Sequence, residues 1–108
     1  MLRVYRQYLG LLVGMRPVLL AIERRDVDLA RQLRRAAASV ALNLSEGSGS
    51  EGGTRRQRYL SALGSARETV ACLEVAAALG YLTPPAGLLS ELGQVVGTLV
   101  VLAVGRRG

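Results

Sequence analysis

The chain has 108 residues, a formal net charge of +6 and only arginine among its basic side chains. This length suits one domain with one hydrophobic core. The chain has no histidine and a single cysteine, Cys72, which excludes an internal disulfide framework, a multi-cysteine zinc site and histidine catalysis. We expect no metal, no cofactor and no enzymatic activity, with Cys72 as a small buried hydrophobe.

The hydrophobic composition favours helices over strands. Hydrophobic residues make up 50% of the chain, but only 4% of the chain is aromatic, and every aromatic residue is tyrosine. Alanine and leucine lose little entropy on becoming helical. The β-branched residues do not alternate with polar ones as they would in strands. The composition therefore predicts an all-α fold.

The first helix is expected at about residues 2–24. Its apolar side is marked by Tyr5, Leu9, Leu12, Leu19 and Ile22. Pro17 is expected to kink this helix or to mark a boundary, because proline lacks a backbone donor and clashes with the preceding turn.

The second helix has the clearest amphipathic pattern in the chain. Asp26 or Asp28 can cap its start, and Gly47 is expected to end it in the left-handed conformation. The apolar face carries Leu29, Leu33, Ala36, Val40 and Leu44. The opposite face carries Arg24, Arg31, Arg34 and Arg35.

The third helix is expected to follow a flexible connection over residues 47–53, with Thr54 as its cap. Its seam alternates steps of four and three through Tyr59, Leu63, Ala66, Val70, Leu73 and Ala77. This spacing indicates left-handed, coiled-coil-like packing. A second apolar strip lies beside the seam and contains Leu60, Gly64, Ala71, Val75 and Ala78. The helix thus has more apolar surface than one partner helix covers.

The fourth helix is expected at residues 86–104, after a sharp stop at Gly80 to Pro85. Its seam contains Leu88, Leu92, Val95, Leu99 and Leu102, and most other positions are also apolar. We expect no membrane span, because Glu91 and Gln94 interrupt the run, and a cytoplasmic protein. Four helices with short links predict an up-down-up-down four-helix bundle. The surplus apolar surface predicts a homo-oligomeric ring.

The middle of the chain resembles a known family. The motif Gln32-Leu-Arg-Arg-Ala-Ala-Ala-Ser39, followed by Asn43 and Glu46-Gly47, is similar to the central motif of the four-helix-bundle 23S rRNA intervening sequence proteins. Further similar segments are Arg58-Tyr-Leu60, Ala62-Leu-Gly-Ser65 with Glu68, and Leu79-Gly-Tyr-Leu82. They occur in the expected order over about residues 29–82.

The resemblance implies a four-helix bundle and favours a pentamer, since some members of the family are pentameric. The family is named for reading frames within insertions in ribosomal RNA genes. A related group contains accessory proteins of diversity-generating retroelements, which assist a reverse transcriptase. Relatives often have a basic residue where this chain has Ser50.

Several polar residues lie beside the predicted core. We expect a structural network in which Glu46 pairs with Arg58 or Arg67. The full set is Asn43, Glu46, Arg58, Arg67 and Glu68. Direct contact of these residues with a ligand is the alternative.

The arginines are the main functional lead. A phosphate-binding surface is expected at Arg24, Arg31, Arg34, Arg35, Arg55 and Arg56. Arg25 and Arg58 lie close to these in the sequence. The alternative is a solvated face whose arginines pair with Glu23, Asp26 and Asp28.

These patterns leave two functions open. The first is a non-catalytic oligomeric protein that binds RNA or DNA through arginines, largely without regard to sequence. The second is an oligomeric scaffold or adaptor for another protein, such as a reverse transcriptase, in which the charge is incidental.

Overall fold

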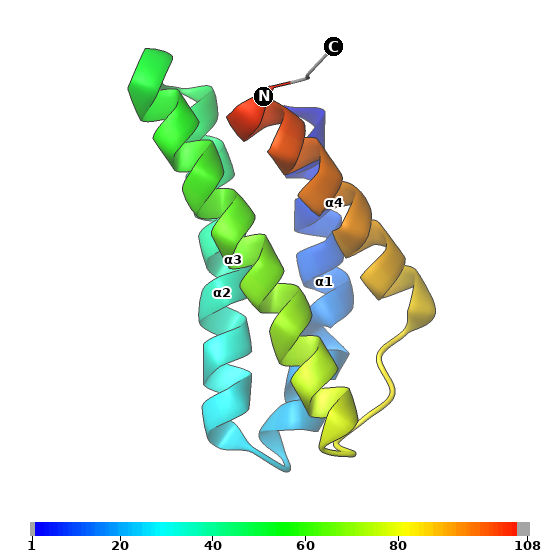
Figure 1. The fold of residues 1–108 in the computed structure, drawn as a ribbon. Helices are drawn as coiled ribbons and strands as arrows, with labels where there is room; N and C mark the ends of the chain where they lie inside the picture. The colour runs from blue at the N-terminus through cyan, green and yellow to red at the C-terminus, as the bar shows by residue number, and fades with distance from the viewer. Residues whose placement is uncertain (1, 106–108) are drawn as a thin grey trace.

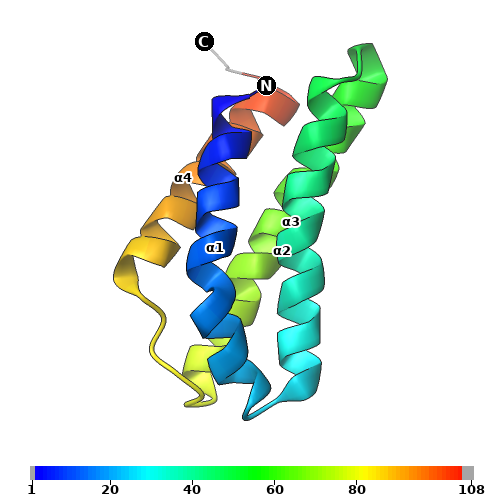
Figure 2. The same ribbon diagram turned by 180° about the vertical axis from the view of Figure 1, so that it is seen from behind.

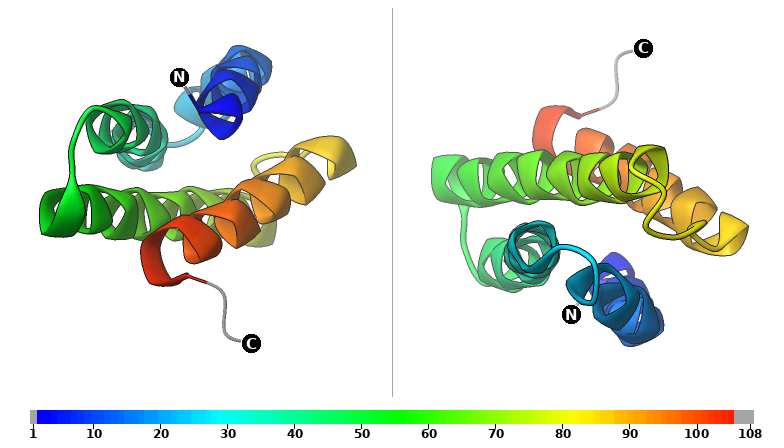
Figure 3. Two further views of the ribbon diagram at one scale, coloured as in Figure 1. Left: turned by 90° about the horizontal axis from the view of Figure 1, so that it is seen from above. Right: turned by 90° about the horizontal axis from the view of Figure 1, so that it is seen from below.

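The computed structural model describes residues 2–105. This range contains four helices, which are α1 (Arg3–Glu23), α2 (Val27–Ser48), α3 (Gly52–Ala78) and α4 (Ala86–Val104). Successive helices run in opposite directions (Figures 1 and 2). Seen from either end, α1 and α2 form one layer, and α3 and α4 form the other (Figure 3). Each helix packs on its two neighbours in the order α1–α2–α3–α4–α1. The predicted all-α four-helix bundle is confirmed.

Small aliphatic side chains fill the space between the layers. Alanines line the interface of α2 with its neighbours, and Ala30, Ala36 and Ala37 are all buried. The largest fully buried side chains are Tyr8, Met15, Ile22, Leu33, Leu44, Leu73, Leu92 and Leu99. The small alanine side chains allow α2 to pack closely against its neighbours.

The buried face of α1 includes Ile22 as predicted, but its other residues lie one position before the predicted ones or between them. The buried residues are Val4, Tyr8, Leu11, Met15, Val18 and Ile22. Leu9 is exposed, and Tyr5, Leu12 and Leu19 are only half-buried. The apolar pattern alone does not identify the buried face of α1, because apolar residues such as Val13 and Leu20 also lie on its exposed side. Pro17 lies inside α1 and marks no boundary.

Tyr8 anchors α1 to α2 from within the core. Its side chain is fully buried, and its hydroxyl donates a 2.8 Å hydrogen bond to the Ala37 carbonyl oxygen. Burial raises the pKa of the Tyr8 hydroxyl well above its usual value, against a smaller lowering by Thr69. The hydroxyl therefore stays protonated and keeps donating.

The link between α2 and α3 is much shorter than predicted. Helix α2 continues through Gly47 to Ser48, and α3 begins at Gly52, where φ is +56°. The expected left-handed Gly47, the flexible connection over residues 47–53 and the Thr54 cap are therefore wrong. Gly47 is buried against Tyr59, and a Cβ atom added to Gly47 would lie 2.5 Å from Tyr59 Cε1. Glycine at 47 thus serves close helix packing rather than a turn.

The buried face of α3 is wider than a single heptad seam. Thr69, Cys72 and Ala76 are buried, whereas Val70 is half-buried and Ala77 is exposed. The shift arises because α3 packs on both α2 and α4. Burial raises the pKa of the Cys72 thiol, with a further contribution from Glu68. The prediction of a buried Cys72 is confirmed.

Helix α4 follows its predicted seam except at the end. Leu88, Leu92, Val95 and Leu99 are buried, but Leu102 is half-buried and Ala103 occupies the last core position. A small residue suits position 103, because Arg56 reaches from α3 to α4 there. Arg56 Nε donates a 3.1 Å hydrogen bond to the Ala103 carbonyl oxygen.

Asp26 joins the two loops at one end of the bundle. Its carboxylate accepts a 2.9 Å hydrogen bond from the Leu29 backbone N–H, which caps α2, and another of 2.9 Å from the Tyr81 hydroxyl after α3. The guanidinium carbon of Arg25 lies 5.7 Å from the Tyr81 ring centroid. The Leu29 hydrogen bond, followed by that of Tyr81, lowers the pKa of Asp26. Of the two predicted caps, Asp26 is the residue used.

Because Gly47 contacts Tyr59, replacing it with alanine should change the free energy of unfolding in the opposite direction to the same replacement at Gly64. Gly47→Ala should lower the free energy of unfolding by about 1–3 kcal/mol, because the methyl group has to displace a buried ring. Gly64→Ala, also inside a helix but with nothing within 4 Å of the new Cβ, should raise it by about 0.5–1 kcal/mol. Urea unfolding at one protein concentration measures both. Equal effects at the two sites would contradict this account of Gly47.

Candidate nucleic-acid interface

The outer face of α2 carries the first group of arginines. Arg31, Arg34 and Arg35 are exposed on the side of α2 away from its buried leucines, and exposed Arg24 follows the end of α1. This placement follows from the helical period, since Leu29, Leu33 and Val40 turn into the core. The arginines therefore project into solvent without disturbing the bundle.

Two of these arginines are paired with carboxylates. Arg34 Nη2 lies 2.9 Å from Glu23 Oε1, which joins α2 to the end of α1. Arg31 Nη1 lies 3.5 Å from Asp28 Oδ1 within α2. Asp26, the third acid considered for this role, instead caps α2 and accepts from Tyr81. Within residues 2–105, Arg24 and Arg35 have no ion pair, so their charges are not neutralised locally.

Arg16 belongs to the same surface, although in the sequence it stands out only as an interruption of an apolar run. Arg16 and Arg34 line a shallow hollow of about 240 Å³ between α1 and α2, together with Leu19 and Leu20. Arg16 and Arg34 lie equally far from Arg25 in the chain, and antiparallel helices bring such positions side by side. The register of the predicted hairpin is therefore the signal that could have found Arg16.

The second group of arginines lies at the opposite end of the bundle. Arg55 and Arg56 are near the start of α3, at the end where α2 finishes (Figure 1). Arg55 Nε donates to the Ser50 carbonyl oxygen at 2.7 Å, and Arg56 Nε donates to that of Ala103 at 3.1 Å. Neither has an ion pair with any residue the structure describes. The six predicted phosphate contacts thus form two separate groups.

The expected polar network is divided as well. Of the two candidate partners for Glu46, the structure pairs it with Arg58, whose Nε lies 3.0 Å from Glu46 Oε2. Arg67 and Glu68 are exposed, and neither makes a hydrogen bond or an ion pair in the described part of the chain. The prediction that they join the network is wrong, because both side chains are exposed on α3 and contact neither Asn43 nor Glu46 through a hydrogen bond or an ion pair.

Asn43 takes part in a different set of contacts. Its Nδ2 donates to the carbonyl oxygen and the Oγ of Ser39, at 3.0 and 3.1 Å. Ser65 Oγ on α3 donates to Ser39 Oγ at 2.8 Å. Thr69 Oγ1 in turn donates to the Ser65 carbonyl oxygen at 2.8 Å. This set of hydrogen bonds joins α2 to α3, with Ser39, Asn43 and Ser65 half-buried and Thr69 buried, and it has a structural role.

Helices α3 and α4 expose small and apolar residues as well as charged ones such as Arg67, Glu74 and Glu91. We call the exposed small and apolar residues the α3–α4 face, and it contains Ala71, Val75, Ala78, Gly93, Gly97, Val101 and Val104. By length and composition α4 could cross a membrane, since it has 19 residues with a mean hydropathy of 1.8. Only 28% of that window is buried. The apolar surplus predicted for these helices is thus solvent-exposed in the single chain.

Acidic and sulfur ligands are scattered. Across residues 2–105, no three His, Cys, Asp or Glu side chains are grouped so that they could hold a metal ion. The surfaces described above therefore offer guanidinium groups and apolar side chains.

The comparison with known families gives a match over most of the chain. A family model described as "23S rRNA-intervening sequence protein" matches residues 14–97. No curated protein and no solved structure matches the chain significantly.

Proposed function

Because the chain belongs to the 23S rRNA-intervening sequence protein family, we propose that it is a non-catalytic, oligomeric accessory protein that binds RNA or DNA through its arginines. The family name associates these proteins with ribosomal RNA, which agrees with an RNA ligand. The proposal places the protein in the cytoplasm and not in a membrane.

One observation carries the nucleic-acid proposal. Arg24 and Arg35 are exposed, and no carboxylate within residues 2–105 pairs with them. Arg16 and Arg34 extend the same surface through the hollow between α1 and α2. Guanidinium groups bind phosphate oxygens in a bidentate manner, and each phosphate neutralised releases counterions.

The binding should be largely independent of base sequence. Base recognition in single strands depends on aromatic platforms. Tyr8 and Tyr59 are buried, Tyr5 is half-buried against the core, and Tyr81 is engaged with Asp26 and Arg25. The α2 surface thus offers charge without stacking partners, so phosphate contacts dominate.

The oligomer in this proposal rests on the α3–α4 face. Soluble monomers rarely leave a continuous apolar surface uncovered. A second copy of the chain is the proposed cover, and the resemblance of the sequence favours a pentamer. A bilayer is a poorer cover, because Leu88, Leu92, Val95 and Leu99 are buried in the bundle and α4 would have to leave the core to span a membrane.

Light scattering tests the assembly. The wild type should be larger than the 11.5 kDa of one chain at micromolar concentration. Val75→Glu should shift the protein toward the monomer, since it places a charge on the α3–α4 face. Leu42→Glu is the matched control, because Leu42 is 64% exposed on α2 in the other layer, and it should leave the mass unchanged. A monomeric wild type would overturn the proposed oligomer.

A salt titration of RNA and DNA binding tests the arginine surface. Arg35→Glu should weaken binding to unrelated sequences alike, and the dependence of log K on log salt should become shallower by about 0.7–0.9 for each phosphate that the variant no longer neutralises. Arg67→Glu changes the charge equally but lies on α3, so it should have a much smaller effect. Thermal melts and light scattering confirm that both variants fold and assemble.

The scaffold function is the competing proposal. If the wild type shows no salt-sensitive binding to any RNA or DNA, the nucleic-acid proposal fails. The arginines would then be a solvated face, and a protein partner such as a reverse transcriptase would be the ligand to seek.

A further inference from the structure

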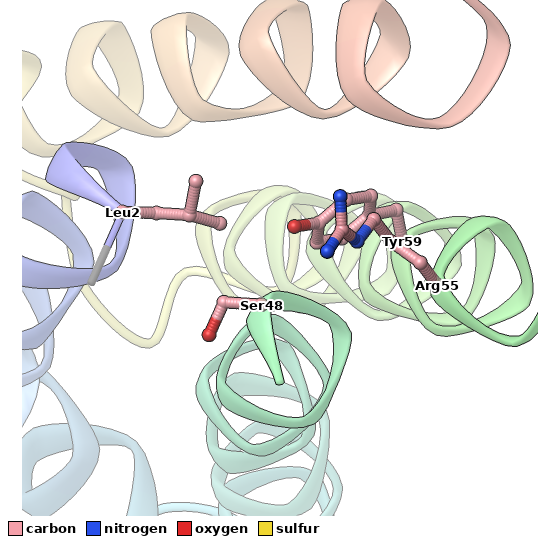
Figure 4. Close-up of a pocket in the computed structure, with 4 residues that line it drawn as sticks. All are labelled: Leu2, Ser48, Arg55 and Tyr59. Atoms are coloured by element: carbon pink, nitrogen blue, oxygen red, sulfur yellow. The ribbon is translucent and has the colours of Figure 1, made fainter. Parts of the chain in front are cut away.

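A second hollow lies where α2 ends and α3 begins. It has a volume of about 330 Å³ and is lined by Leu2, Ser48, Arg55 and Tyr59. In Figure 4, Leu2 faces across the hollow toward the Tyr59 hydroxyl and the Arg55 guanidinium, which lie on the α3 side. The volume is at the lower end of the range for small-molecule sites. The hollow is thus large enough for more than a water molecule.

The Tyr59 hydroxyl is an unusual group within this hollow. The side chain is 4% exposed, and buried tyrosine hydroxyls normally have a hydrogen-bond partner. The hydroxyl of Tyr8, the other buried tyrosine, donates to Ala37. The Tyr59 hydroxyl has no hydrogen-bond partner among residues 2–105. In the same range, every polar side-chain atom that is shielded from solvent has a hydrogen-bond partner. It follows that the Tyr59 oxygen is reached from outside, through the hollow.

Arg55 is held on the same wall. It precedes Tyr59 by one helical turn, so both side chains lie on one face of α3. Its Nε donates to the Ser50 carbonyl oxygen at 2.7 Å, which fixes the guanidinium at the helix start. Its two terminal nitrogens have no acceptor within the described chain. The hollow therefore presents three groups that can donate hydrogen bonds at once.

The Tyr59 ring is held by its packing. It lies so close to Gly47 that any side chain there would overlap it. The nearby carboxylate of Glu46 is already paired with Arg58 at 3.0 Å. The donors of the hollow are thus in place before a ligand arrives, which lowers the entropy cost of binding.

From this geometry we infer that the hollow binds a phosphate group of a nucleotide, with the Tyr59 hydroxyl and the terminal nitrogens of Arg55 as donors and Leu2 as an apolar wall. Arg56, which has no ion pair among the described residues, adds positive charge at this end, whereas the charge of Arg58 is offset by Glu46. The added charge favours a phosphate over a singly charged carboxylate. The inference rests on the proposed function, because it names the chemical group that Arg55 binds. A free nucleotide and a strand both carry this group, and the experiment below distinguishes them.

Calorimetric titrations with 5′-AMP, adenosine and a short single-stranded RNA test this site. Tyr59→Phe keeps the ring against Gly47 and removes only a hydroxyl that has no protein partner, so the thermal melt should not change. It should weaken phosphate binding by about tenfold, and Arg55→Gln by at least as much. Arg67→Gln, which removes a charge from an exposed position further along α3, is the control and should leave AMP binding unchanged.

The outcomes separate this inference from the proposed function. AMP binding that is tighter than adenosine binding and about tenfold weaker in Tyr59→Phe supports a free-nucleotide site, whatever the RNA result. RNA binding weakened by Tyr59→Phe, without AMP binding, supports a strand phosphate. Normal ligand binding by both Tyr59→Phe and Arg55→Gln overturns the site but leaves RNA binding through α2 intact. A wild type that binds neither AMP nor any RNA or DNA overturns both.

Discussion

The close contact between Gly47 and Tyr59 determines the geometry at one end of the bundle. Because residue 47 has no side chain, the Tyr59 ring packs directly on the α2 backbone. Gly47 is therefore buried in the last turn of α2, and the chain needs only a short link before α3 starts at Gly52. Neighbouring residues use the same register, since Glu46 pairs with Arg58 across the two helices. One missing side chain thus aligns the longest helix with its main partner.

The same contact connects the fold to the proposed chemistry. While the Tyr59 ring packs on Gly47, its hydroxyl points into the hollow that Arg55 also lines. The hydrogen bonds of Asn43, Ser39 and Ser65 support the helices further along. The positions of the arginines on the outer face of α2 are set by the buried leucines of that helix and not by the contact between Gly47 and Tyr59. The two basic regions can therefore be tested separately.

The sequence predicted the number and type of the elements well, because the periodicity of α2 and the prolines before α4 are local signals. It misplaced most of the buried face of α1, since that helix is apolar on nearly all sides and only its neighbours decide which side is buried. The prediction for Gly47 is wrong for a similar reason. In the sequence, a glycine that ends a helix cannot be distinguished from one that packs against an aromatic ring, because the contact with Tyr59 forms only in the folded bundle. The register of the antiparallel helices also brings Arg16 close to Arg34 in one hollow. It likewise places Arg55 far from the arginines of α2.

The central claim, that Gly47 is needed because of the Tyr59 ring, is tested most directly by a double-mutant cycle. The effect of Gly47→Ala on the free energy of urea unfolding is measured in the wild-type and in the Tyr59→Leu backgrounds. A smaller, flexible side chain can move away from the new methyl group, so the cost of Gly47→Ala should largely disappear when leucine replaces Tyr59. The same cost in both backgrounds would show that Gly47 is needed for another reason and would contradict the account.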